Sequence, residues 1–559
     1  MVEAIVERLE AKQELLRRLE AIVAPETILA SNTSSLSITA IAAACERPQR
    51  VAGFHFFNPV PLMRVVEVVD GLASAPEVGD ALLALAARLG HRGVRTRDSP
   101  GFIVNHAGRA YGTEALRILG EGVAECAEID RVLRECAGFR MGPFELLDLT
   151  GLDVSHPVME SIYQQYYQEP RYRPHPLTRQ LLAAGRLGRK SGQGFYRYVD
   201  GQPQDKPGPQ PVPQAAIRPP VWLGCENEDD RRTLAELLHR LGVEPETGER
   251  PSAAALCLLA AWGEDLSSAV QRFACPAERS VGIDLLCDLE RRRCLMLSPL
   301  TTPAMRDAAH ALLAGDGAGV TMLRDSPGFV VQRILAMIVN LACDIAQQGI
   351  ASVEDIDQAV HLGLGYPHGP LEWGDRLGPR RLLSILQRLQ ALTGDPRYRP
   401  SPWLRRRAQL GMSLRGSPGF PGRQSRYRTL RTVHSRRQRR AARQAAAPRR
   451  TAGRLPQRPA AAEHHPGADD ERRGCRGLRP GLGRRRHRLP RLPPVRQPGA
   501  PALAADPDGG GAGQHAPERG PARQHRRSAA PPGAHHRRAE ERGLSPGDGR
   551  RAGVLPARP

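Results

Sequence analysis

The strongest constraint on the fold of this chain is an internal repeat with an offset of 227 residues. Three motifs recur at this offset: RDSPGFIV (97–104) as RDSPGFVV (324–331), GPFELLD (142–148) as GPLEWGD (369–375), and EID (128–130) as DID (355–357). A fourth motif, PRYRP, recurs with an offset of 226 residues, at 170–174 and 396–400. Collinear matches of this kind indicate a duplicated structural unit.

The repeated unit has the apolar spacing of helices. After each Ser-Pro-Gly turn, apolar residues recur every three or four positions, in the segments that begin at Asn105 and Arg333. Each copy therefore predicts a small bundle of helices.

The residues before the first copy have a different pattern, in which strands alternate with helices. Helical spacing over 8–23 and 75–89 lies between short runs rich in β-branched and aromatic residues. This alternation predicts an α/β domain built on a parallel sheet. The predicted strands are 2–6, 26–30, 51–57, 64–69 and 91–96.

The net charge of +21 would suggest an anionic partner such as nucleic acid, but it is confined to one end of the chain. Residues 415–559 hold 34 Arg, no Lys and 10 acidic residues, with much Pro and Gly, which predicts disorder. Three interpretations stay open: a solvated basic tail, a nucleic-acid-binding arm, and an out-of-frame translation of GC-rich DNA. The abrupt change of composition and the lack of RGG or aromatic repeats favour the last over nucleic-acid binding.

The spacing of the cysteines and the length of the apolar runs indicate in which cellular compartment the protein lies. The ten Cys residues form no CxxC pair and show no metal-ligand spacing, so no metal site is predicted. No apolar run approaches the roughly 20 residues that cross a bilayer, and no signal peptide is recognisable. The sequence predicts a reduced, cytoplasmic protein without a membrane partner.

A histidine and a glutamate are candidates for acid–base chemistry. His55 lies in a predicted strand, the turn-forming Asn58-Pro59-Val60-Pro61 follows, and Glu67 lies in the next strand. A reversal there could place the imidazole beside the carboxylate, which would fix the tautomer and support a general base. A purely structural role for such a pair is the commoner case.

Three more residues have ordinary interpretations when each is taken alone. Ser34 in SNTSSLSI could be part of a helix cap, Asn105 could be a cap or a contact within the bundle, and Lys190 could be a solvated turn residue.

Taken in order, however, these motifs resemble the 3-hydroxyacyl-CoA dehydrogenase family, especially HFFNPVP followed by VVEV. The likeness covers residues 2–198 almost continuously, and a weaker second copy of the family's helical domain covers about 324–411. The tandem arrangement is similar to long bacterial members linked to 3-hydroxybutyryl-CoA or 3-hydroxyadipyl-CoA oxidation.

The resemblance implies NAD-dependent oxidation of an L-3-hydroxyacyl-CoA thioester to the 3-ketoacyl-CoA, as in fatty-acid or aromatic-acid degradation. It implies that His55 is the base, that Glu67 orients it, and that Asn105 and Ser34 hydrogen-bond the substrate. It also implies a homodimer. The NAD neighbours that it implies are Glu7, Lys12, Ser34, Asn58 and Lys190.

The sequence departs from the family pattern in three places, one of which is the change to the Arg- and Pro-rich tail after the second helical copy. No GxGxxG turn precedes the first predicted strand, so we expect an N-terminally truncated NAD-binding domain and weak or no activity for the chain as written. In the second half, the position of His55 maps to Gly282 by the offset or to Leu295 by matching the turns, and Gln332 replaces Asn105. A catalytically silent second copy is therefore expected.

The predicted fold class is α/β: a partial, doubly wound Rossmann-type domain followed by all-helical dehydrogenase domains and a disordered tail. The alternative to a dehydrogenase is a non-catalytic module for acyl-CoA binding or dimerisation. The predicted units are the incomplete NAD-binding domain (1–97), the first helical domain (98–199), a Pro-rich linker (200–219), a degenerate α/β segment (220–322), the second helical domain (323–414) and the basic tail (415–559).

Overall fold

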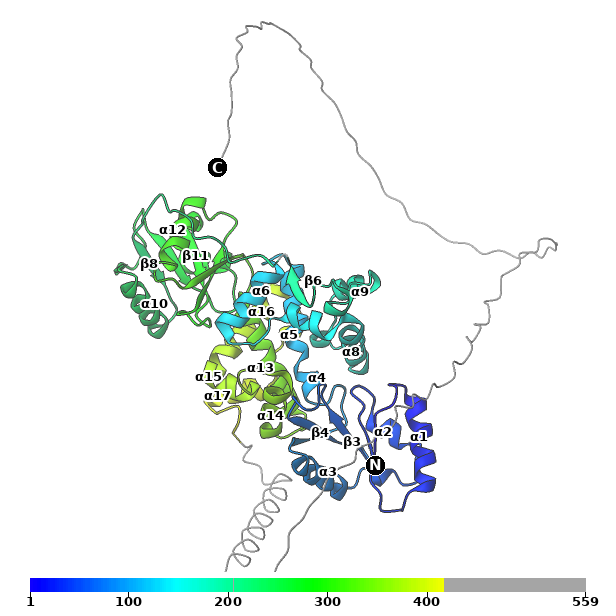
Figure 1. The fold of residues 1–559 in the computed structure, drawn as a ribbon. Helices are drawn as coiled ribbons and strands as arrows, with labels where there is room; N and C mark the ends of the chain where they lie inside the picture. Colours follow the sequence, from blue (N-terminus) through cyan, green and yellow to red (C-terminus); the bar gives the residue numbers. More distant parts are fainter. Residues whose placement is uncertain (205, 417–559) are drawn as a thin grey trace, which may run out of the picture. The chain divides into compact units, whose positions relative to one another are not determined.

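The structure is a computed structural model and describes residues 1–204 and 206–416 (Figure 1). The predicted disordered tail lies outside these residues, except for its first two positions. The chain begins with a five-stranded sheet in which neighbouring strands are parallel, apart from the antiparallel pair β3 and β4. In order, the strands are β1 (Val2–Glu3), β2 (Leu29–Ser31), β3 (Val51–Phe56), β4 (Val65–Asp70) and β5 (Arg92–Arg97).

Helices cover both faces of this sheet, which confirms the predicted α/β class. Alternate residues of a strand point to opposite faces, so Val51 joins the apolar cluster under one pair of helices while Phe54 joins the cluster under another helix. Strands buried on both faces read as continuous apolar runs, as VAGFHF and VVEVV do. The helices are α1 (Leu9–Ile22) and α2 (Ile38–Ala42) on one face and α3 (Pro76–Arg88) on the other.

The repeated Ser-Pro-Gly turn joins each sheet to its helices with one backbone conformation. Gly101 and Phe102 have φ angles of 78° and 50°, and their counterparts Gly328 and Phe329 have 75° and 52°. A side chain at Gly101 would also approach the backbone nitrogen of His106, so glycine is required there.

Helices follow each turn in the same order. The first copy consists of α4 (Val104–Ala107), α5 (Arg109–Gly120), α6 (Cys126–Ala137), α7 (Pro143–Thr150), α8 (Leu152–Gln165) and α9 (Pro176–Ala183). The second consists of α13 (Val331–Gln347), α14 (Val353–Leu364), α15 (Pro370–Leu377), α16 (Pro379–Thr393) and α17 (Pro402–Leu410). In the second copy, one continuous helix takes the place of α4 and α5.

A second sheet lies between the two helical copies in sequence. It has six strands in the order β13-β12-β11-β10-β8-β9, and again one antiparallel pair, β11 and β12. Its strands are β8 (Val221–Gly224), β9 (Pro245–Glu246), β10 (Leu256–Ala260), β11 (Ser280–Ile283), β12 (Arg292–Leu297) and β13 (Gly319–Arg324). Its helices are α10 (Glu228–Arg240), α11 (Leu266–Phe273) and α12 (Pro303–Leu313).

The segment between the first helical copy and the second sheet makes contacts along its length. It starts with a hairpin of β6 (Arg197–Val199) and β7 (Gln202–Gln204). Lys206 then forms an ion pair with Glu145 of α7, and the Gln210 side chain accepts a hydrogen bond from the backbone of Met322 in β13. The residues predicted as a linker therefore begin in a hairpin and are held against both neighbours.

The repeated acidic motif and the repeated Gly-Pro motif act together, because the aspartate of the first caps the helix that begins at the second. The Asp130 carboxylate accepts hydrogen bonds from the backbone nitrogens of Phe144 and Glu145, at 3.0 and 3.1 Å, at the start of α7. Asp357 does the same for α15. These bonds satisfy amide groups that a helix start leaves free. A Cβ at Gly142 would overlap the Asp130 side chain, so the glycine belongs to the same motif.

We expect Gly142→Ala to lower the free energy of unfolding by about 1–3 kcal/mol, because the added methyl displaces the capping carboxylate. Gly112→Ala is the matched control: this helical glycine has no atom near the added Cβ, so the change is expected to be neutral or stabilising. Urea unfolding of both variants measures the difference. Equal midpoints for the two variants would contradict the shared capping device.

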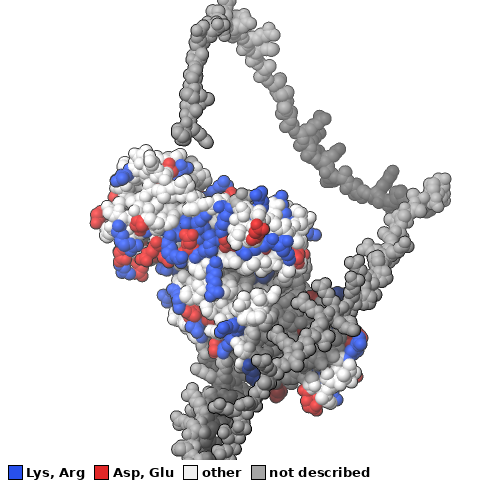
Figure 2. Space-filling view, in the orientation of Figure 1, with Lys and Arg blue, Asp and Glu red and all other residues white. Residues whose placement is uncertain are grey.

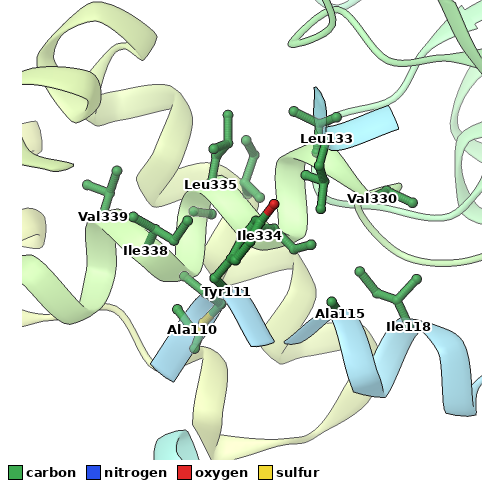
Figure 3. Packing of buried hydrophobic residues seen from close by; sticks show 14 of the residues in the cluster. Ala110, Tyr111, Ala115, Ile118, Leu133, Val330, Ile334, Leu335, Ile338 and Val339 are labelled. Atoms are coloured by element: carbon green, nitrogen blue, oxygen red, sulfur yellow. The ribbon is translucent and has the colours of Figure 1, made fainter. Parts of the chain in front are cut away.

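The two helical copies pack against each other through α5 and α13 (Figure 3). Ala110, Tyr111 and Ile118 of α5 and Ile334 and Ile338 of α13 are all buried in one apolar cluster. The apolar face of each helix is thus covered by the other copy within a single chain.

The arginine of each repeated PRY motif forms an ion pair with an acidic residue of the other helical copy. Arg171, in the first motif, pairs with Asp344 of α13, while Arg397, in the second, pairs with Glu114 of α5 at 3.5 Å. All four side chains are buried.

Charges on the described surface are mixed. Figure 2 shows Lys and Arg side chains interspersed with Asp and Glu over the visible face. Among the described residues, no helix has both the length and the apolar character that crossing a membrane requires.

Candidate active site

His55 and Glu67 lie side by side on the antiparallel strands β3 and β4. The strand register pairs the two residues directly, and the His55 Nδ1 atom lies 2.7 Å from the Glu67 Oε2 atom. Both side chains are buried, and Glu67 has no exposed surface. The turn 57–64, which includes a cis Asn58-Pro59 peptide bond, joins the two strands. The structure therefore brings together the imidazole and the carboxylate that the sequence singled out.

The other oxygen of Glu67 is held by the start of α4. Its Oε1 atom accepts hydrogen bonds from the backbone nitrogens of Ile103 and Val104, at 2.9 and 2.8 Å. An ionised carboxylate is an acceptor only, so the His55 Nδ1 atom must carry the proton of the shared bond. In the neutral imidazole the Nε2 atom then has a lone pair, and this is the tautomer that a general base needs.

Aromatic rings enclose the imidazole. The ring centroid of Phe57 lies 4.4 Å from that of His55, and the centroid of Phe102 lies 5.9 Å away. Phe102 is the residue with the left-handed conformation in the Ser-Pro-Gly turn. The turn thus serves the site twice, because it packs on the histidine and presents the amides that bind Glu67.

Ser34 and Asn105 meet at the edge of the sheet. The Asn105 side-chain nitrogen donates to the Ser34 carbonyl oxygen at 3.4 Å. Ser34 lies in the loop after β2, and Asn105 lies in the first turn of α4, right after the amides that bind Glu67. Loop and helix therefore meet one residue after the amides that bind Glu67, while the Ser34 hydroxyl itself donates to Glu7 at 3.3 Å.

A pocket of about 410 Å³ lies beside the loop after β2, and none of His55, Glu67, Ser34 and Asn105 is among the residues that line it. Its walls come from the loop after β2, the Ser-Pro-Gly turn and the end of α8, and they include Ser35, Asp98, Ser99, Gln165 and Tyr167. Its volume falls within the usual range for pockets that bind small molecules.

Glu7 and Lys12 lie on the other side of the same loop. The Glu7 carboxylate accepts hydrogen bonds from the Thr33 hydroxyl at 2.7 Å and from the Ser34 nitrogen at 2.9 Å. Burial alone would raise the pKa of Glu7, but these bonds and Lys12 hold it below its ordinary value. Lys12 is buried and pairs with Glu3 at 3.1 Å and with Glu7 at 3.4 Å.

The structure does not bring the two remaining predicted residues into this network. Asn58 is exposed in the turn between β3 and β4. Lys190 lies near the start of α8, where its ammonium group pairs with Asp153 at 2.5 Å.

Two family profiles match most of the described residues. The NAD-binding domain of 3-hydroxyacyl-CoA dehydrogenase matches residues 1–99, and the C-terminal domain of the same enzymes matches both 101–198 and 328–419. The chain belongs to the 3-hydroxyacyl-CoA dehydrogenase family.

Several family members are similar over long stretches. The 3-hydroxyadipyl-CoA dehydrogenase of Escherichia coli K12 is 40% identical over 412 residues, which are 73% of this chain and 80% of that one. The mitochondrial hydroxyacyl-coenzyme A dehydrogenase of Sus scrofa is 44% identical over 198 residues, or 63% of its length. The solved 3-hydroxybutyryl-CoA dehydrogenase of E. coli K12 superposes with a TM-score of 0.64 at 39% identity, covering 73% of this chain and 81% of that one.

NAD is the cofactor of this family, and the described residues fit it in part. Doubly wound sheets bind nucleotides beyond the carboxyl ends of their strands, where Glu7 and Ser34 lie. The buried Lys12 has its donors occupied by Glu3, Glu7 and the Ile5 carbonyl oxygen, so it acts through Glu7 rather than as a free cation. Bound NAD would supply the acceptor for a hydride.

Sequence reasoning missed two supports of this dehydrogenase site. Glu3 binds Lys12, and Thr33 binds Glu7. Thr33 stands inside the SNTSS motif, where a hydroxyl next to Ser34 was a usable signal. Glu3 could not be found, because its role depends on the pairing of β1 with β2, which sets it beside Ser31.

The second sheet carries a different pair at the corresponding position. Glu67 corresponds to Cys294 by the offset of 227, and the backbone nitrogen of Asp284 donates to the Cys294 carbonyl oxygen across the antiparallel strands. Asp284 is therefore the counterpart of His55, and the alignments to Gly282 and Leu295 are wrong. The chain between the paired residues Asp284 and Cys294 is two residues shorter than that between His55 and Glu67, and a fixed offset does not follow this difference.

Proposed function

We propose that this chain oxidises L-3-hydroxyacyl-CoA thioesters to 3-ketoacyl-CoA with NAD, using His55 as the base. The buried His55–Glu67 pair, 2.7 Å apart with the free ring nitrogen as acceptor, carries this proposal. The homologues are enzymes of this reaction class.

Each residue of the proposed site has its own role in the reaction. His55 takes the hydroxyl proton at Nε2 while C3 loses a hydride, so that the C–O bond becomes a carbonyl. Glu67 stabilises the imidazolium that forms. Asn105 and Ser34 hold the substrate oxygens, which restricts the alcohol to one orientation. Glu7, Lys12, Asn58 and Lys190 stay predictions as neighbours of the cofactor.

A thermal-shift experiment with acetoacetyl-CoA and NAD, each alone and together, tests the assignment. A dehydrogenase should be stabilised by both ligands, and more by the two together. Stabilisation by the thioester alone would instead indicate the non-catalytic acyl-CoA-binding module. Formation of NADH from 3-hydroxybutyryl-CoA is the direct measurement, and its absence at high enzyme concentration would contradict the proposal for this chain.

We also propose a cytoplasmic location and a homodimer. The nine cysteines of the described residues form no disulfide, which supports a reducing compartment. Light scattering on the purified chain decides the oligomeric state.

A further inference from the structure

Three buried cysteines from distant parts of the chain meet where α6 packs against strand β12 of the second sheet. Cys136 lies in the last turn of α6, Cys287 follows β11, and Cys294 lies in β12. Their sulfur atoms all lie within 4.8 Å of one another, and those of Cys136 and Cys294 are 3.7 Å apart.

These separations fit a shared metal ion. Zinc binds thiolates at about 2.3 Å in a tetrahedron, which puts two sulfur ligands about 3.8 Å apart. A disulfide would need a sulfur–sulfur distance of about 2.05 Å. Isolated buried cysteines are ordinary small apolar residues, but three converging sulfur atoms from two separate segments are a ligand set.

The carboxylate of Asp284 is buried next to this cluster, but its oxygens do not lie within 4.8 Å of all three sulfur atoms. The Asp284 side chain is fully buried beside Cys294, and its Oδ1 atom accepts bonds from the Gln332 side chain and the Leu286 nitrogen. Its Oδ2 atom is buried and has no hydrogen-bond partner among the described residues. A buried carboxylate oxygen without a partner is costly unless a cation satisfies it.

The guanidinium group of Arg292, whose backbone carbonyl oxygen lies 3.6 Å from the Cys136 sulfur, is bound to other groups. Arg292 donates from Nε to Glu135 at 2.8 Å and from Nη1 to the Val320 carbonyl oxygen and the Thr321 hydroxyl. It therefore ties β12 to α6 and β13.

We propose that Cys136, Cys287 and Cys294 form a zinc site, and that the Asp284 carboxylate moves toward the ion as the fourth ligand when zinc binds. The sequence predicted no metal site, because Cys136 lies 158 residues from Cys294 and only the fold joins them. Four protein ligands in a buried position are the arrangement of a structural zinc, so the ion fastens α6 of the first helical copy to the second sheet. The site takes no part in the chemistry at His55.

Metal analysis of the purified full-length chain tests this proposal. We expect stoichiometric zinc when the protein is prepared under reducing conditions without chelators. Cobalt substituted for zinc should give the intense thiolate-to-cobalt charge-transfer band and the visible spectrum of a tetrahedral site. Cys136→Ser and Cys294→Ser should each lose the zinc and the cobalt spectrum, and Asp284→Asn should hold zinc more weakly in competition with a chelator.

Cys343→Ser is the matched control, because Cys343 is equally buried but lies in α13, outside the cluster. It should keep the full zinc content. No zinc on the native chain and no cobalt spectrum would overturn the proposal, as would zinc retained equally by all variants. Loss of two titratable thiols without metal would also overturn it in favour of a disulfide. The cobalt spectrum of the unmutated chain keeps the test valid if a variant fails to fold.

Discussion

Replacing His55 by Gln is expected to lower the rate of NADH formation from 3-hydroxybutyryl-CoA by about 10²–10⁴-fold, the usual contribution of a general base. The change removes the nitrogen that would accept the hydroxyl proton, while an amide of similar size can still reach Glu67. Initial rates at saturating substrate and NAD, compared with those of the unmutated chain, give the result.

Glu67→Gln tests the positioning of the imidazole. The amide oxygen can still accept from Ile103 and Val104, but the amide nitrogen would then face His55 and donate to Nδ1. The ring would have to carry its proton on Nε2, the wrong tautomer for a base, so we expect a loss of at least about 10²-fold. The pH dependence of the rate should change as well, because an amide does not stabilise the imidazolium.

His239→Gln is the control for both variants. His239 also pairs with a glutamate, Glu244, at 2.9 Å, but that pair is exposed on the surface. Its loss should leave the rate unchanged. A His55→Gln variant as fast as the unmutated chain would remove the basis of the proposed function.

Much of the architecture could be predicted from the sequence, because the repeats and the spacing of apolar residues agree with the fold that the chain adopts. The repeat offset located both helical copies, and alternating strands and helices located the first sheet. The pairing of His55 with Glu67 could be anticipated because both lie in apolar strands joined by a Pro-rich turn. Because the two residues are only twelve positions apart in sequence, their pairing can be predicted once the single turn between their strands is predicted correctly.

Contacts between segments that are far apart in the sequence could not be predicted from such local patterns. Lys190 was assigned by resemblance, yet its partner Asp153 depends on how α8 follows α7. The counterpart of His55 in the second sheet was misplaced because its paired residues, Asp284 and Cys294, are two positions closer in sequence than His55 and Glu67, so the offset of 227 does not hold there. The cysteine cluster depends on α6 packing against β12, which no local pattern reveals.

Glu114→Ala is expected to lower the free energy of unfolding by about 3–5 kcal/mol, as found when one member of a buried ion pair is removed. Glu114 is buried between the helical copies, 2.8 Å from Arg333, and accepts a hydrogen bond from the Tyr398 hydroxyl at 2.6 Å. Its loss leaves Arg333 and Arg397 buried with less opposite charge. Thermal and urea unfolding measure the effect.

Glu372→Ala is the control for this variant, because Glu372 forms a more exposed pair with Arg376 at 2.6 Å. Such pairs contribute little, so a change of at most about 1 kcal/mol is expected. If the two variants were equally stable, the buried network would not be what holds the copies together.

The pH dependence of stability separates the charge of Glu114 from its packing. Burial alone would raise the pKa of Glu114, but Arg333 and Arg397 hold it below its ordinary value of 4.5. A lowered pKa in the folded state stabilises the protein above pH 4.5, and this contribution is lost as the pH falls through the folded-state value. The difference in stability between the unmutated chain and Glu114→Gln should therefore shrink below about pH 4.5. A difference that stays constant down to acid unfolding would mean that packing, rather than the ion pair, sets the cost.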